Sequence, residues 1–161
     1  MARRVGKNGV VVAIEPHPFT FQTLVRNINL NHVTNVLALN VAAWNGESHL
    51  KLFTAQWAGR NSVKTDRKQG WVTVPARRMD EVLTELKLTR VDWVKIDGEG
   101  AEYEALEGFS DTIQKYKPRI VLEVERPHFA RVKRFLELQR YNMLNIASSY
   151  YLGTPIPEDD S

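Results

Sequence analysis

Short apolar runs alternate with amphipathic stretches along the first part of the chain. Val10–Ile14 and Val36–Leu39 are continuous apolar runs of the length of buried strands. Between them, apolar residues recur at i, i+3, i+4 and i+7 from Phe21, which is the spacing of one face of a helix. The pattern therefore predicts a strand–helix–strand unit.

The second half of the chain repeats this alternation. A helix is predicted to begin near Ala101, and another carries an apolar stripe that starts at Phe129. A short turn at Ser148 and Ser149 joins the last two strands. The predicted strands of this half are Val91–Ile96, Ile120–Val124, Met143–Ile146 and Tyr150–Leu152.

The middle of the chain carries turn signals and shorter elements. Asn45–Gly46 predicts a tight turn, and the strand candidates Leu50–Leu52 and Trp71–Val74 follow it. The intervening segment Gln56–Gly70 is polar, and we interpret it as an excursion over the surface that can act as a lid. Asp80 is expected to be the N-cap of a short helix.

This order of elements predicts an α/β fold with a mostly parallel, Rossmann-like sheet that closes with a C-terminal antiparallel hairpin. We expect a single domain over residues 1–161. Its acidic, proline-bearing tail, Pro155–Ser161, is expected to be mobile.

Composition narrows the class of protein. The chain has 22 Lys and Arg against 19 Asp and Glu, no cysteine, and no apolar run long enough to span a bilayer. A cytoplasmic protein without disulfides or a membrane anchor is the simplest interpretation. The basic residues are scattered in small groups, which disfavours a nucleic-acid partner because a phosphate track needs clustered charge.

Three predicted strands each end at a carboxylate. Glu15, Asp97 and Glu123 directly follow or close these apolar runs, and Glu99 lies two residues beyond Asp97. Ligands of open α/β sheets bind at the carboxyl ends of the strands, so we expect one site lined by these acids. For Glu102 we prefer a role at the positive end of a helix dipole. No complete set of metal ligands is evident, so no metal site is predicted.

Four segments carry a family resemblance. They are Ala13-Ile14-Glu15-Pro16-His17-Pro18, Asn27-Ile28-Asn29-Leu30-Asn31, Val94-Lys95-Ile96-Asp97-Gly98-Glu99-Gly100-Ala101-Glu102 and Lys117-Pro118-Arg119-Ile120-Val121-Leu122-Glu123. In order and spacing they resemble the FkbM-type S-adenosylmethionine-dependent methyltransferases, over nearly the whole chain from about Val5 to Tyr151.

The resemblance implies a cofactor, S-adenosyl-L-methionine, and a set of residues that bind it. By resemblance Glu15 accepts hydrogen bonds from the ribose hydroxyls, and Pro16 and His17 flank the adenine or ribose. Val41 and Ala42 line the adenine, and Asp97 lies beside the reactive methyl. Two simpler interpretations remain open: Glu15 can pair with a basic residue, and His17 can be an ordinary loop histidine.

The resemblance also implies methyl transfer, most simply to a hydroxyl of a small molecule or a sugar. Asp97, Glu99 and Glu123 are the candidates for acceptor binding or for removal of the hydroxyl proton. Two other functions stay open: a non-catalytic binding or partner protein that keeps the fold, and a nucleic-acid-binding module.

The family's first strand and glycine-rich turn have no counterpart before Val10 in this sequence. In the family that strand lies between the strands that here begin at Val10 and Val91. We therefore expect those two strands either to pair directly or to borrow a strand from another copy, because open apolar edges promote association. The second possibility predicts a homo-oligomer that forms through exposed sheet edges.

Overall fold

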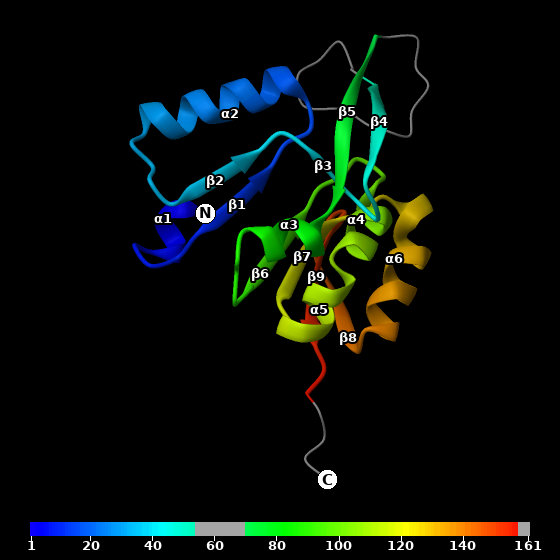
Figure 1. Cartoon of the computed structure of the whole chain (residues 1–161). Coiled ribbons are helices and arrows are strands. Elements are labelled where there is room, and N and C mark those ends of the chain that lie inside the picture. The colour runs from blue at the N-terminus through cyan, green and yellow to red at the C-terminus, as the bar shows by residue number, and fades with distance from the viewer. Residues whose placement is uncertain (54–69, 158–161) are drawn as a thin grey trace.

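The computed structural model describes residues 1–53 and 70–157, which contain both helices and strands (Figure 1). The helices are α1 (Ala2–Val5), α2 (Pro18–Leu30), α3 (Met79–Glu85), α4 (Glu102–Gly108), α5 (Ser110–Tyr116) and α6 (Arg126–Leu138). The strands are β1 (Val11–Ile14), β2 (Val36–Leu39), β3 (Ala42–Trp44), β4 (Ser48–Phe53), β5 (Trp71–Arg78), β6 (Trp93–Ile96), β7 (Arg119–Glu123), β8 (Tyr141–Ala147) and β9 (Tyr150–Pro155). The α/β class is as the sequence predicts.

The strands of the described residues form three sheets rather than one. β1 and β2 make a parallel pair. β3 pairs in parallel with β5, and β5 pairs antiparallel with β4. The third sheet has the order β6-β7-β9-β8, in which β6 and β7 are parallel and β9 is antiparallel to both of its neighbours. The C-terminal antiparallel hairpin is thus as expected, whereas residues 1–53 and 70–157 form no continuous, mostly parallel sheet.

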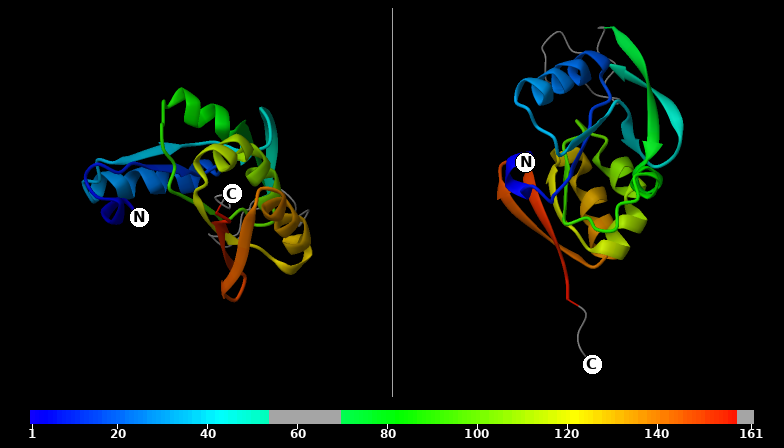
Figure 2. Two further views of the ribbon diagram at one scale, coloured as in Figure 1. Left: turned by 90° about the horizontal axis from the view of Figure 1, so that it is seen from below. Right: turned by 60° about the vertical axis from the view of Figure 1, so that its left-hand side comes forward.

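Direct pairing of the strands at Val10–Ile14 and Val91–Ile96 was one expectation, and it is wrong for the described residues. There β1 pairs with β2 alone and β6 with β7 alone. The reason is the connectivity of the chain. β3 begins two residues after β2 ends, and β3 pairs with β5, so the β1–β2 pair is connected to the β3–β5–β4 sheet and not to the sheet of β6. The left view of Figure 2 shows the blue N-terminal elements to one side of the yellow and orange C-terminal ones.

The buried core lies in the C-terminal part of the chain. Its larger cluster contains fully buried Leu106, Ile120, Leu122 and Leu136, which come from α4, β7 and α6. A smaller cluster lies within the β3–β5–β4 sheet around Val74 and Ala76. By contrast, α1 and α2 contain no buried residue, and all four residues of β1 are only half-buried. The N-terminal unit therefore contributes little to the core.

Two local expectations are corrected by tertiary contacts. Asp80 is not an N-cap: α3 begins at Met79 after Arg78, and the Asp80 carboxylate instead accepts the backbone N–H groups of Asp111 (3.0 Å) and Thr112 (2.8 Å) at the start of α5. The single helix predicted after Ala101 is in fact two helices, because Phe109 interrupts the helical backbone between α4 and α5.

The first residues of the expected mobile tail, Pro155 and Ile156, belong to the ordered fold. Pro155 closes β9, and the backbone N–H of Ile156 donates to the carbonyl of Arg140 (2.8 Å). That part of Pro155–Ser161 is therefore ordered by the sheet, and residues 158–161 lie outside the described residues. The expected excursion at Gln56–Gly70 also falls almost wholly outside them. Across residues 1–53 and 70–157, no helix combines the length and the apolar character that crossing a bilayer requires.

Candidate active site

Glu15 stands directly after β1, at the carboxyl end of the β1–β2 pair. Its backbone N–H donates to the carbonyl of Leu39 (3.0 Å), and its Oε1 accepts the backbone N–H of His17 (2.9 Å). The side-chain amide of Asn40 donates to the carbonyls of Glu15 (2.8 Å) and Pro16 (2.9 Å). Asn40, directly after β2, therefore fixes the loop that presents the Glu15 carboxylate.

A pocket of about 460 Å³ opens beside β1. It is lined by the β1 strand and Glu15, by one face of α2, by Met1 and by Lys95 of β6. Residues from both open strand edges thus face the same space. Its volume lies within the range of small-molecule sites.

Lys95 connects this pocket to the acids after β6. Its ammonium pairs with the Asp97 carboxylate (2.9 Å), and the two side chains are similarly accessible, at 39% and 38% exposed. Lys95 therefore lines the pocket that Glu15 lines and also contacts Asp97. Because both side chains are exposed, the contribution of this pair to stability is small.

Glu123 at the end of β7 accepts two hydroxyl donors from the hairpin of β8 and β9. Ser149 Oγ donates to Oε1 (3.2 Å), and the Tyr150 hydroxyl donates to Oε2 (2.7 Å). The antiparallel register that places Glu123 opposite Tyr150 produces this contact.

Tyr150 interacts with candidate acids that follow two different strands. The hydrogen bond to Glu123 raises the pKa of the Tyr150 phenol above its usual value, and the nearby charges of Glu123, Asp97 and Glu99 raise it further. A phenol surrounded by carboxylates resists ionisation because its phenolate would be repelled by them. Glu123 contacts this hydroxyl, whereas Asp97 and Glu99, which follow a different strand, raise its pKa through their charges.

The remaining residues expected at the cofactor lie as follows. Pro16 and His17 form the half-buried loop into α2, where His17 is the N-cap residue. Val41 is half-buried between β2 and β3, and Ala42 is buried at 6% exposure in the β3–β5–β4 sheet. Among the described residues, no group of three or more His, Asp or Glu side chains is arranged to hold a metal ion.

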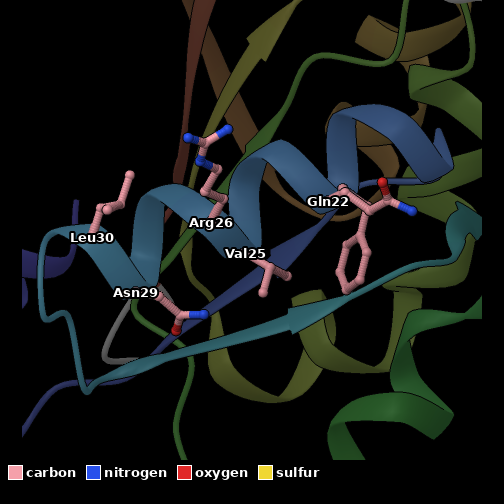
Figure 3. A pocket seen from close by; sticks show the side chains of 6 residues that line it. Gln22, Val25, Arg26, Asn29 and Leu30 are labelled. Carbon is pink, nitrogen blue, oxygen red and sulfur yellow. The ribbon is translucent and has the colours of Figure 1, made fainter.

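A second pocket, of about 420 Å³, lies on α2 alone (Figure 3). Its six lining residues all come from that helix, and none of them is acidic. In Figure 3, Val25 and Asn29 lie on one side of the helix and Arg26 on the other. This surface groove offers no group for acid or base chemistry, so the pocket beside Glu15 is the better candidate.

Sequence reasoning missed the contact of Tyr150 and the role of Asn40 in fixing the Glu15 loop. A tyrosine next to a serine pair in a predicted turn gives no local signal of a contact with Glu123, 27 residues away. An asparagine directly after a buried strand is a stronger signal, because its short amide can tie neighbouring loops together.

Comparison with known proteins identifies the family of this chain. Residues 1–143 match the family described as the Methyltransferase FkbM domain, so the chain belongs to the FkbM methyltransferase family, as its motifs indicate. The chain is 28% identical over 158 residues to "Methyltransferase 1" of Beauveria bassiana (strain ARSEF 2860). This match covers 84% of this chain and 64% of that protein. It therefore spans a little less than two thirds of the length of that relative.

A solved structure shares the fold. The crystal structure of methyltransferase FkbM from Methylobacillus flagellatus KT superposes with a TM-score of 0.63 at 17% identity, over 91% of this chain and 36% of the other. At that identity the likeness concerns the fold alone.

Proposed function

We propose that this chain carries the cofactor and acceptor sites of an S-adenosyl-L-methionine-dependent methyltransferase that acts on a hydroxyl of a small molecule or sugar. Family membership supports methyl transfer. The single observation that carries the proposal is that Glu15 and Lys95 line one pocket while Lys95 pairs with Asp97, so the two strand ends serve one region.

The carboxylate acceptor beside β1 fits the ribose end of the cofactor. Glu15 is half-buried at a strand end, and only its Oε1 is engaged by His17 within the described residues. A carboxylate so placed accepts hydrogen bonds from a diol, and such bonds are strengthened by the charge. Pro16 and His17 follow Glu15 directly, in the loop that leads into α2. When bound, the cofactor supplies an electrophilic methyl group on a sulfonium centre.

The acids after β6 and β7 suit the binding of the methyl acceptor. Methyl transfer to a hydroxyl needs the oxygen aligned with the methyl carbon and a base that takes up the hydroxyl proton. Glu123 accepts one O–H donor on each oxygen, and each oxygen keeps a second lone pair for the hydroxyl of a methyl acceptor. Asp97 and Glu99 are the further candidates on the β6 side, and Tyr150 is a hydroxyl that can orient the acceptor.

Calorimetry with S-adenosyl-L-methionine tests the cofactor part of the proposal. We expect measurable binding to the chain, and a loss of at least about tenfold in affinity on Glu15→Ala, since hydrogen bonds to a charged group contribute about 1.5–3 kcal/mol. Glu137→Gln, an exposed acid on α6, is the matched control and should bind as the parent does. A folded parent chain that gives no heat would favour the non-catalytic binding protein.

Self-association follows from the same geometry, and we propose that the chain forms homo-oligomers through its open sheet edges. β1 and β6 each have one unpaired edge in the described part of the chain, and exposed apolar side chains such as Val10 (52%) and Trp93 (53%) lie beside them. Light scattering after gel filtration should give a mass above 18.5 kDa that falls when Val12→Pro removes a strand amide. A monomer at all concentrations would refute this.

A further inference from the structure

The turn after β6 has an unusual backbone. The N–H of Ala101 donates to the carbonyl of Gly98 (3.1 Å), which closes a turn over Gly98–Ala101. Its two central residues, Glu99 and Gly100, both have positive φ, at 48° and 100°. Glycine adopts this region freely, but a glutamate does so at an energetic cost, so other contacts must hold Glu99 there.

Glu102 supplies those contacts from inside the protein. Its Oε1 accepts the backbone N–H of Gly98 (3.2 Å) and the backbone N–H of Gly100 (2.9 Å). The residue is 2% exposed, which is rare for an acid. One buried carboxylate oxygen therefore fastens both ends of the segment that contains Glu99.

Glu102 lies in the first turn of α4, as expected for an acid at the positive end of a helix dipole. That role alone does not account for its hydrogen bonds to Gly98 and Gly100. Glu102 is also buried, and its Oε2 has no hydrogen-bond partner in the described residues. Burying a carboxylate with one unbonded oxygen is unfavourable. The turn geometry that Glu102 imposes explains why this cost is accepted.

We propose that Glu102 is a positioning residue, whose buried carboxylate sets the Gly98–Ala101 turn and thereby the places of Asp97 and Glu99 at the end of β6. The role of those two acids in methyl transfer rests on the proposed function. The fastening of the turn by Glu102 does not, so the two can fail separately.

Amide hydrogen exchange and NMR of the full chain test the proposal without any substrate. In Glu102→Ala, exchange at Gly98 and Gly100 should accelerate at least about tenfold relative to exchange at Ile120 in the core, because each amide loses a charged acceptor. The Asp97 carboxyl resonance should move as well, since its pair with Lys95 depends on the same turn. Equal acceleration at all three amides would show general destabilisation instead, and would overturn the positioning role.

Two more variants keep the test decisive. Glu102→Gln retains an acceptor oxygen, so protection of both glycine amides should be largely restored while their proton resonances move upfield, as expected for a neutral acceptor. Unchanged resonances in this variant would refute the contact even if Glu102→Ala does not fold. Glu104→Gln is the matched control: this acid lies two residues on in the same helix, is 9% exposed and pairs with Arg131, and its change should leave Gly98 and Gly100 unaltered.

Discussion

The Tyr150 hydroxyl donates a 2.7 Å hydrogen bond to Oε2 of Glu123, across the register pair that joins β9 to β7. This contact places the phenol of Tyr150 close to carboxylates that lie far from it in the sequence. It also makes Tyr150 a reporter of the candidate site, because the ionisation of its phenol responds to the surrounding charges.

Removal of the Glu123 charge should lower the pKa of Tyr150. The hydrogen bond to Glu123 is the largest cause of the raised pKa, followed by burial and by the charges of Glu123, Asp97 and Glu99. In Glu123→Gln the pKa should therefore fall toward the ordinary value, and in Asp97→Asn it should fall by less. The titration of the Tyr150 ring carbon by NMR measures both shifts. A Tyr150 pKa that is the same in Glu123→Gln and in the parent would disprove this arrangement.

Asp80 should be important for stability because it joins two parts of the fold. Its carboxylate accepts two amides of α5 and pairs with Arg78, while its side chain is 8% exposed. We expect Asp80→Ala to lower the free energy of unfolding by about 2–4 kcal/mol, from the lost cap and the unpaired amides. Chemical denaturation measures the change.

Asp111 provides the control for that experiment. It pairs with the same Arg78 at 2.8 Å, but its side chain is 73% exposed. An exposed ion pair contributes little, so Asp111→Asn should change the free energy of unfolding by less than about 1 kcal/mol. Equal losses in the two variants would show that the arginine pair, and not the cap on α5, is what stabilises this junction.

Gly108 should tolerate no side chain. A Cβ at this position would lie 2.0 Å from the backbone carbonyl oxygen of Trp44, where α4 meets β3. Gly108→Ala must displace backbone, and we expect a loss of about 1–3 kcal/mol or more in the free energy of unfolding. Gly46→Ala is the control, since nothing lies within 4 Å of a Cβ there, and its melting temperature should stay close to that of the parent.

Tyr141 should make stability fall at alkaline pH. Burial raises the pKa of Tyr141 to about 12, and its hydroxyl donates to the carbonyl of Pro118 (2.8 Å). Because the pKa is raised above the ordinary value near 10, the folded state keeps the proton and its full advantage below about pH 10. That advantage, about 2–3 kcal/mol, is lost as the pH rises from about 10 to about 12.

Tyr141→Phe isolates this effect. The variant should be about 1–3 kcal/mol less stable at pH 8, because the Pro118 carbonyl loses its donor. The difference from the parent should then shrink as the pH rises through that window. Denaturant titrations at several pH values measure it, and a difference that stays constant up to pH 12 would contradict the assignment.

Much of the local structure was predictable from the sequence. The strands around Val12, Ile96 and Leu122 follow from unbroken apolar runs, and the helix after His17 follows from its 3.6-residue period. The acids at strand ends and the motif from Val94 to Glu102 led to the correct family. These features are local, because the period of the apolar positions and the residue that interrupts them are fixed within about ten residues.

The tertiary structure decided what no local pattern encodes. It assigned Asp80 to the start of α5, 31 residues away, and Glu123 to Tyr150, 27 residues away. It buried Glu102, and it kept β1 apart from β6. A short polar side chain can satisfy many partners equally well, so the packing of distant elements selects the partner. From the sequence alone most of the elements and the acids at their ends could be placed, because apolar periods are local. Which of those acids meet was decided by the arrangement of the sheets, because that depends on how distant elements pack.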